Sequence, residues 1–320
     1  MRFKKSKSTV SISLKFTLPL IKKEIVFQYV ALFFIVALSF IGFRTLLFAN
    51  SFPKTSITFE PIMNQFLPKK VFASSPPSLK GKLISYGSRE KKEVALTFDA
   101  DMTYGMEQML SSGEVESFYD QKLIDVLQET GTKATLFLSG LWIETYPEVA
   151  RELAGDPLFE LANHSYSHPS FSGDCYGLRQ ISEEDKYNEI EKTQELLKGL
   201  THSDNKLFRF PGGCYSAKDL ALLKTFGLTA VEWDTVGNDG FNDNADAILF
   251  NVLNKVHNGS IIVLHMNGYP NEPKTAQVLP TIISTLKEQG FSFVTVSELL
   301  FSQHASQVFS IRQLLQYNIL

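Results

Sequence analysis

Short apolar runs alternate with helical patterns along the chain after residue 91, and this alternation predicts a parallel α/β architecture. The apolar runs are rich in Val, Ile, Leu and Phe, which is typical of strands buried on both faces. The predicted strands are 93–98, 133–138, 158–162, 207–210, 228–233, 260–265 and 291–296. The predicted helices are 123–127, 147–154, 182–200, 217–226, 247–257 and 275–289, with a short one starting at 297. Such crossovers return the chain to the same end of the sheet, as parallel strands require.

Because every predicted strand is short and apolar, we expect a distorted (β/α) barrel of about seven parallel strands rather than an open sheet. No GxGxxG turn follows the first strand, which argues against a dinucleotide-binding fold. Residues 102–117 are expected to form a polar loop. The predicted domain spans residues 91–302, and a weakly helical tail follows at 303–320.

The N-terminal part has a different pattern. Residues 25–43 carry no charge, and a helix of that length spans roughly 28 Å, close to the hydrocarbon thickness of a bilayer. The first 23 residues contain seven Lys or Arg and no acidic residue. We therefore predict a cytoplasmic basic segment at 1–24, a transmembrane signal-anchor at 25–43 and an extracytoplasmic linker at 44–90. The alternative is a secreted protein, released by cleavage of a signal peptide.

Composition adds two constraints. The 320-residue chain has a net charge of -3 and a pI near 6.1, which give no reason to expect nucleic acid as a partner. Its two cysteines, Cys175 and Cys214, could form a disulfide outside the cytoplasm, and two free buried thiols are the alternative.

Reactive side chains follow the carboxyl ends of the predicted strands, which share one rim in a parallel barrel. They are Asp99, Asp101, His164, His168, Arg209, Asp239 and His265. Two histidines and one carboxylate are a ligand set for a divalent metal that leaves positions open for water. The metal-bound water then becomes a nucleophile near neutral pH.

The remaining groups complete a hydrolytic set. A second carboxylate can act as the base for that water, and the guanidinium of Arg209 can orient it. His265 can protonate a leaving group. We interpret the set as a hydrolase of an amide or ester. The alternative is that each residue is only a buried hydrogen-bonding partner.

Five short motifs occur in an order that resembles one family. They are Thr97–Asp101 (TFDAD), His164–His168 (HSYSH), Arg209–Gly213 (RFPGG), Trp233–Asp239 and Val263–His265. Over roughly 91–302 the chain resembles the polysaccharide deacetylases, also called NodB-homology or carbohydrate esterase family 4. The resemblance implies a distorted barrel of about seven strands, in agreement with the strand pattern.

The resemblance also implies a role for each residue. Asp99 would be the catalytic base, held by Arg209, and the backbone N–H of Gly212 would help to stabilise the oxyanion. His265 would be the general acid, paired with Asp239. The implied metal ligands are Asp101, His164 and His168. Zinc is the expected divalent ion, with Co, Ni or Mn as alternatives.

Three positions depart from the family pattern. Ala100 separates two aspartates that are usually adjacent, and Asp101 is assigned as a ligand because some members carry an Asp-x-Asp form. Gly240 stands where a Trp usually forms a wall of the acetyl pocket, and Phe241 is a candidate substitute. Val263 replaces the usual Leu in the last motif.

The expected activity is the removal of N-acetyl groups from an acetylated glycan such as peptidoglycan, a chitin-like polymer or another polymer of N-acetylglucosamine. One alternative is an O-acetyl esterase acting on a polysaccharide. Another is a catalytically inactive glycan-binding protein with the same fold.

Overall fold

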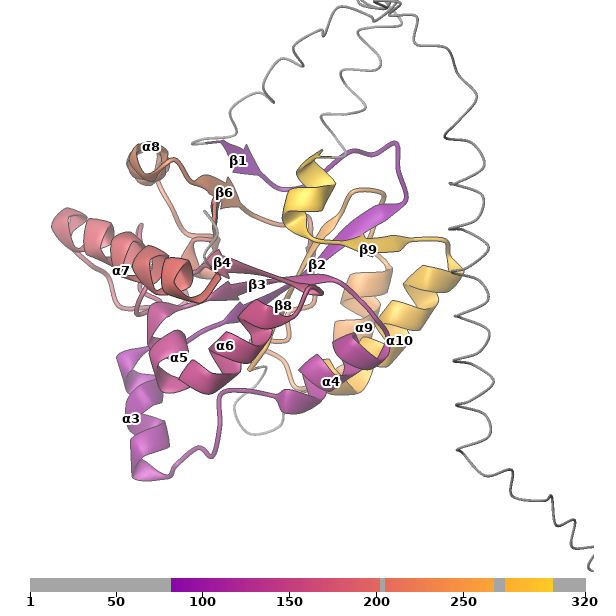
Figure 1. The fold of residues 1–320 in the computed structure, drawn as a ribbon, viewed down its shortest axis with the longest axis horizontal. Coiled ribbons are helices and arrows are strands. Elements are labelled where there is room, and N and C mark those ends of the chain that lie inside the picture. The colour runs from indigo at the N-terminus through magenta and orange to yellow at the C-terminus, as the bar shows by residue number, and fades with distance from the viewer. Residues whose placement is uncertain (1–81, 202–204, 268–273, 302–320) are drawn as a thin grey trace, which may run out of the picture. The chain divides into compact units, whose positions relative to one another are not determined.

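A nine-stranded sheet organises the residues that the computed structural model describes, 82–201, 205–267 and 274–301, and all its ladders are parallel (Figure 1). Its order is β1-β6-β5-β4-β3-β2-β8-β7, and β9 pairs with the start of β2. The strands are β1 (Leu83–Ile84), β2 (Glu93–Ala100), β3 (Ala134–Leu138), β4 (Phe159–Asn163), β5 (Leu207–Phe208), β6 (Thr229–Val231), β7 (Thr235–Val236), β8 (Ile261–His265) and β9 (Ser292–Val294). The parallel α/β class is confirmed.

The strand number and the closure of the sheet differ from the prediction. All seven predicted strands are present, but β1 and β7 have two residues each, too few to give a hydrophobic pattern. Among the described residues no ladder joins the edge strands β1 and β7. An isolated antiparallel bridge between Tyr86 and Ser260 links the two sides instead. The fold is a half-barrel rather than a closed barrel, and β1 lies within the segment predicted as a linker.

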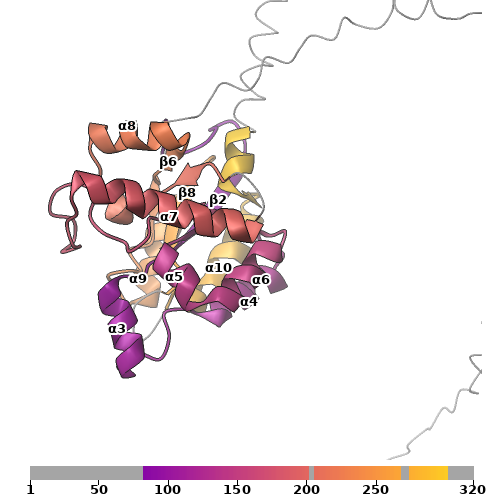
Figure 2. The same ribbon diagram turned by 60° about the vertical axis from the view of Figure 1, so that its left-hand side comes forward.

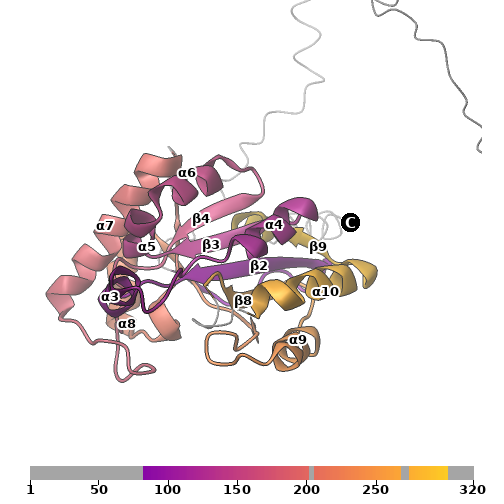
Figure 3. The ribbon, with the colours of Figure 1, turned by 90° about the horizontal axis from the view of Figure 1, so that it is seen from below.

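Eight helices of the described region flank the sheet. They are α3 (Tyr104–Ser112), α4 (Gln121–Glu129), α5 (Gly140–Thr145), α6 (Pro147–Gly155), α7 (Glu183–Thr201), α8 (Ala217–Phe226), α9 (Ala245–Leu253) and α10 (Thr275–Glu288). Figure 3 shows α4, α9 and α10 grouped beside β2 and β8, and α6 and α7 beside β4. Figure 2 shows α7 crossing the front of the domain. Residues 296–301 form a further short helix, as predicted.

The polar loop predicted over 102–117 is wrong for residues 104–112, which form α3. The side chain of Thr103 accepts a hydrogen bond from the Met106 N–H, and Gly113 ends the helix in the left-handed conformation. None of the residues of α3 is buried. The two caps fix the ends of this helix. Its apolar face is too weak to produce a helical periodicity in the sequence, so the helix was not predicted.

Alternation along β2 and β8 places polar groups inside the half-barrel. Leu96 and Phe98 of β2 pack into the main hydrophobic cluster together with Leu264 of β8. Thr97 and Asp99 therefore lie on the other face of β2. Asp99 and His265 are partners in the pairing of the two strands, so their side chains leave adjacent strands at the same level.

The predicted membrane anchor at 25–43, the basic segment before it and the tail after residue 302 lie outside the described residues. Of the helices within the described ranges, none has both the length and the apolar character that crossing a bilayer requires.

Candidate metal and catalytic site

Three predicted ligands meet at the carboxyl ends of β2 and β4. The Oδ1 of Asp101 lies 3.3 Å from the Nε2 of His164 and 3.2 Å from the Nε2 of His168. One ligand atom from each residue lies within 4.8 Å of the other two. The centres of the two imidazole rings are 4.9 Å apart. The three donors therefore converge on one point.

The hydrogen bonding of this group fits a divalent cation. The Nδ1 of His164 lies 2.9 Å from the carbonyl oxygen of Arg209, and since a carbonyl only accepts, Nδ1 carries the hydrogen. In the neutral ring Nε2 then presents a lone pair, as a metal ligand must. Within the described residues, the buried His164 Nε2 and Asp101 Oδ1 have no hydrogen-bond partner. A cation between them would satisfy both atoms.

Charge in the group points the same way. Burial would raise the pKa of Asp101, but His168, His164 and His265 outweigh it and hold that pKa well below its usual range. Burial would lower the pKa of His164, but Asp99 and Asp101 raise it. The site therefore places negatively charged carboxylates against imidazoles. A bound cation can stabilise these carboxylates in place of the imidazole protons.

The loop that carries the two histidines is held by a carboxylate on α7. Glu189 accepts hydrogen bonds from the backbone N–H groups of Tyr166 (2.9 Å) and Ser167 (2.7 Å) and from the Ser167 hydroxyl (2.6 Å). Ser165 and His168 have φ of 64° and 53°, in the left-handed region. Such residues cost about 1–3 kcal/mol each and persist only where the surrounding structure fixes them. Glu189 supplies that support.

The predicted base and its partner are buried together. The Nη1 of Arg209 donates to Asp99 Oδ1 (2.6 Å) and to the Thr97 hydroxyl (2.9 Å), and its Nε donates to the Val231 carbonyl (3.2 Å). The guanidinium lies 3.9 Å above the ring of Phe137. The other oxygen of Asp99, Oδ2, lies 3.6 Å from His164 Nε2. One oxygen of Asp99 is thus fixed by Arg209, and the other faces the ligands.

The predicted acid lies on the opposite side. The Nδ1 of His265 donates to Asp239 Oδ1 (2.8 Å), and the other oxygen of Asp239 accepts from the His265 N–H (2.7 Å) and the Thr275 hydroxyl (2.7 Å). Burial would lower the pKa of His265, but Asp239 and then Asp101 raise it to about 10. The Nε2 of His265 lies 3.8 Å from Asp101 Oδ2. A protonated Nε2 therefore faces the ligand group.

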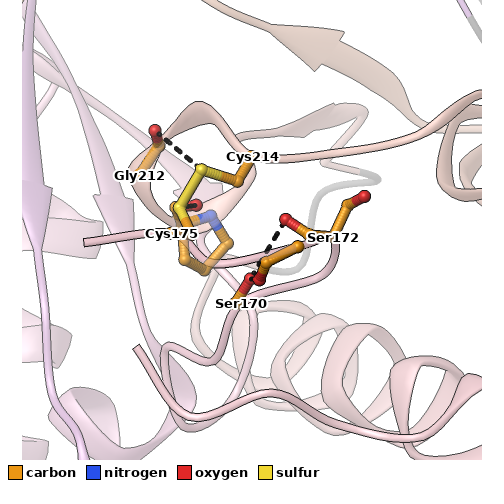
Figure 4. The surroundings of a disulfide bond; sticks show 7 residues. Ser170, Ser172, Cys175, Gly212 and Cys214 are labelled. Carbon is orange, nitrogen blue, oxygen red and sulfur yellow. Dashed lines mark hydrogen bonds between the residues drawn. A yellow bond between two sulfur atoms is a disulfide. The ribbon is translucent and has the colours of Figure 1, made fainter. Parts of the chain in front are cut away.

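Gly212 lies in a tight turn, Pro211–Gly213, next to a disulfide. Cys175 and Cys214 are bonded, with their Cα atoms 6.1 Å apart, so the disulfide alternative is the correct one (Figure 4). Gly212 has a φ of 61°, and a Cβ on it would lie 2.7 Å from the Cys175 sulfur. Both the backbone conformation and the space therefore require glycine here. No contact in the structure tests the predicted role of its N–H.

Phe241 and Val263, the residues predicted to face the substrate, differ in exposure, and their roles stay predictions. Phe241 is 66% exposed, and its ring contacts that of Tyr176, with the centroids 5.1 Å apart. Val263 is buried within β8, where it pairs with Thr97. Gly240 packs directly against the ring of the predicted acid, because a Cβ on it would lie 2.9 Å from His265 Cε1.

Sequence reasoning missed several supporting residues. Thr97 and Thr275 anchor Arg209 and Asp239, and nothing in their local sequence distinguishes them from other threonines. Glu232 gave a usable signal, since it is a carboxylate within the apolar run 228–233. Burial raises its pKa to about 7, with Arg209 opposing that rise. Asp234 of the fourth motif bonds the Ile261 N–H and pairs with Arg89, away from the ligands.

Comparisons with known proteins agree with the family resemblance of the motifs. A family model described as polysaccharide deacetylase matches residues 86–231, which include the three ligands, Asp99, Arg209 and Gly212. A peptidoglycan-N-acetylglucosamine deacetylase of Bacillus cereus is 30% identical over 213 residues, 67% of this chain and 70% of that protein.

Two crystal structures are similar in fold. The peptidoglycan N-acetylglucosamine deacetylase Bc1960 matches with a TM-score of 0.57 and 29% identity, over 68% of this chain and 92% of that one. A carbohydrate esterase family 4 pseudoenzyme from Bacillus anthracis matches with a TM-score of 0.55 and 25% identity, over 68% of this chain and 69% of that one.

Proposed function

The chain belongs to the polysaccharide deacetylase family, and we propose that it is a metal-dependent hydrolase that removes N-acetyl groups from a glycan. One observation carries the proposal. Asp101 and His164 turn unpartnered buried atoms toward a common point, with Asp99 on one side and His265 on the other. The names of the relatives favour peptidoglycan as the substrate class.

The ligand set and the chemistry define the role of the metal. Asp101, His164 and His168 would hold the ion, and zinc is the expected one for two histidines and a carboxylate. When bound, it would polarise the acetyl carbonyl and lower the pKa of water at the site.

The other residues of the chain move protons and place charge. Asp99 takes the proton of the attacking water, while Arg209 keeps the carboxylate oriented through Oδ1. The N–H of Gly212 donates to the oxygen that becomes negative. His265 gives the proton on Nε2 to the departing amine, and Asp239 stabilises the imidazolium until then.

One of the similar structures is a pseudoenzyme, so the alternative of a catalytically inactive glycan-binding protein must be compared with the enzyme. This chain has a base, an acid and three ligands in one constellation, and that set favours an enzyme. The O-acetyl esterase alternative uses the same scaffold, and nothing in the geometry favours it.

We also propose that the catalytic domain lies outside the cytoplasm, attached to the membrane through 25–43. Three observations support this: the charge-free segment, the Cys175–Cys214 disulfide and relatives named for peptidoglycan. Protease digestion of intact cells tests it. The domain should be degraded while a cytoplasmic marker survives, and protection of the domain would contradict the proposal.

Acetate release from oligomers of N-acetylglucosamine tests the activity, with the full-length chain supplied with zinc. Asp99→Asn should reduce the rate by about 10²- to 10⁴-fold, the usual contribution of a general base. His164→Ala should reduce it at least as far, because it removes a ligand. Wild-type rates retained by both variants would sink the assignment, as would a folded, zinc-loaded wild type that releases no acetate from any acetylated glycan.

A further inference from the structure

Two exposed aromatic side chains contact each other at the edge of the site. Tyr176 is 70% exposed and Phe241 is 66% exposed. Their ring centroids are 5.1 Å apart with planes inclined at 38°. Single exposed aromatic residues are common, but two in contact on a surface form an apolar patch that suits a binding partner.

The pair lies beside catalytic elements on both of its sides. The ring of Tyr176 borders Gly212, since a Cβ on that glycine would lie 3.1 Å from Tyr176 Cδ2. Phe241 directly follows Gly240, which packs against the ring of His265. The two aromatic rings therefore connect the predicted oxyanion side of the site with its acid side.

Tyr176 is held in place by covalent and backbone constraints. Its neighbour Cys175 is bonded to Cys214, which follows the turn of Gly212 (Figure 4). The N–H of Leu178 donates to the Cys175 carbonyl (2.9 Å), closing a turn around Tyr176. Tyr176 itself has a φ of 52°, in the left-handed region that costs a non-glycine residue energy.

This backbone conformation is rare in the described part of the chain. The other non-glycine residues with positive φ there are Ser165, His168 and Asn238. Two of these lie in the ligand loop, and the third precedes Asp239. Strain of this kind gathers where a side chain must be aimed, and Tyr176 shares it with the catalytic loops.

We propose that the Tyr176–Phe241 pair is a stacking platform for the sugar ring next to the one that is deacetylated. This rests on the proposed function. A pyranose presents C–H groups on its face and hydroxyls at its edge, so an exposed aromatic ring covers the face and leaves the hydroxyls in water. The disulfide pre-orients the platform and lowers the entropy lost on binding.

Oligosaccharide binding without turnover tests the platform. Calorimetry would use the full-length, zinc-supplied chain carrying Asp99→Asn, with an N-acetylglucosamine tetramer and the monomer as ligands. Adding Tyr176→Ala or Phe241→Ala should raise the Kd for the tetramer about three- to tenfold, the size of one aromatic contact. The Kd for the monomer should not change. Tyr176→Phe should retain tetramer binding because it keeps the ring.

Two further variants separate the platform from general effects. Phe250→Ala removes an equally exposed ring on α9, 67% exposed, and should leave the Kd unchanged. Cys175→Ser with Cys214→Ser keeps both rings but frees the loop, and should weaken tetramer binding. Unchanged binding in both platform variants would overturn the proposal, and so would a parent that binds no tetramer. If these binding differences are found but no acetate is released, the proposed hydrolase activity is wrong and the binding platform still holds.

Discussion

The site contains two aspartate–histidine groups built from the same residue types but with opposite hydrogen bonding. In the group of Asp101, His164 and His168, Asp101 Oδ1 and His164 Nε2 have no partner among the described residues. In the group of Asp239 and His265, both oxygens of Asp239 accept hydrogen bonds. The first group is open toward a cation, and the second is closed around a proton.

The difference shows that residue type does not set the role of a histidine in this site. The Nδ1 of His164 is bonded to a backbone carbonyl, which leaves a lone pair on Nε2 for a metal. The Nδ1 of His265 is bonded to a buried carboxylate, which favours the imidazolium. We propose that the partner of Nδ1 decides whether Nε2 binds a cation, as expected for His164, or gives a proton, as expected for His265.

Removing the closed group should have the largest effect on amide chemistry. We expect His265→Ala to reduce the rate on an N-acetyl substrate by about 10²- to 10⁴-fold, because an amine needs a proton to leave. An O-acetyl ester of the same sugar should lose much less, since an alkoxide leaves more readily. Rates on the matched amide and ester measure this. Equal losses on both would mean that His265 does not act as a general acid.

Moving His265 without removing it should have a smaller effect. In Gly240→Ala the new Cβ would lie 2.9 Å from His265 Cε1, so the ring must shift. We expect kcat on the amide to fall by up to about 100-fold, the effect of a misplacement near 1 Å. Gly199→Ala on α7 is the matched control, because a Cβ there meets nothing within 4 Å. A normal kcat in Gly240→Ala would contradict the close packing of Gly240 on His265.

Removing the negative charge of Asp239 should lower the pKa of His265. In the metal-free protein the pKa of His265 is raised to about 10, chiefly by Asp239 against the effect of burial. We expect Asp239→Asn to lower that pKa, because the amide carries no charge to stabilise the imidazolium. The imidazolium form would then be lost as the pH rises through a lower value. Imidazole chemical shifts measured by NMR against pH test this, and an unchanged pKa would remove Asp239 from the pair.

Much of this arrangement could be predicted from the sequence because its signals are local. The strand ends that carry Asp99, Asp101, His164 and His265 follow apolar runs, and parallel crossovers must bring such ends to one rim. The disulfide remained open, since sequence does not give the distance between Cys175 and Cys214.

The features that were missed depend on contacts between distant segments. Glu189 accepts hydrogen bonds from the histidine loop although it lies on a helix more than twenty residues later, and it is one of many charged residues of α7. Closure of the barrel depends on how close a curved sheet brings its edge strands. The edge strands β1 and β7 have two residues each, which is too short to give a recognisable hydrophobic pattern. The caps of α3 outweigh a weak apolar pattern.

Metal content measured on matched variants tests the contrast between the two groups most directly. After zinc loading and desalting, elemental analysis should find about one ion per chain in the wild type, as for a three-residue ligand site. We expect the same content in His265→Ala, and a loss of most of the metal in His164→Ala. Equal zinc in His164→Ala and the wild type, or zinc lost only with His265, would contradict the division of the site into an open metal group and a closed proton group.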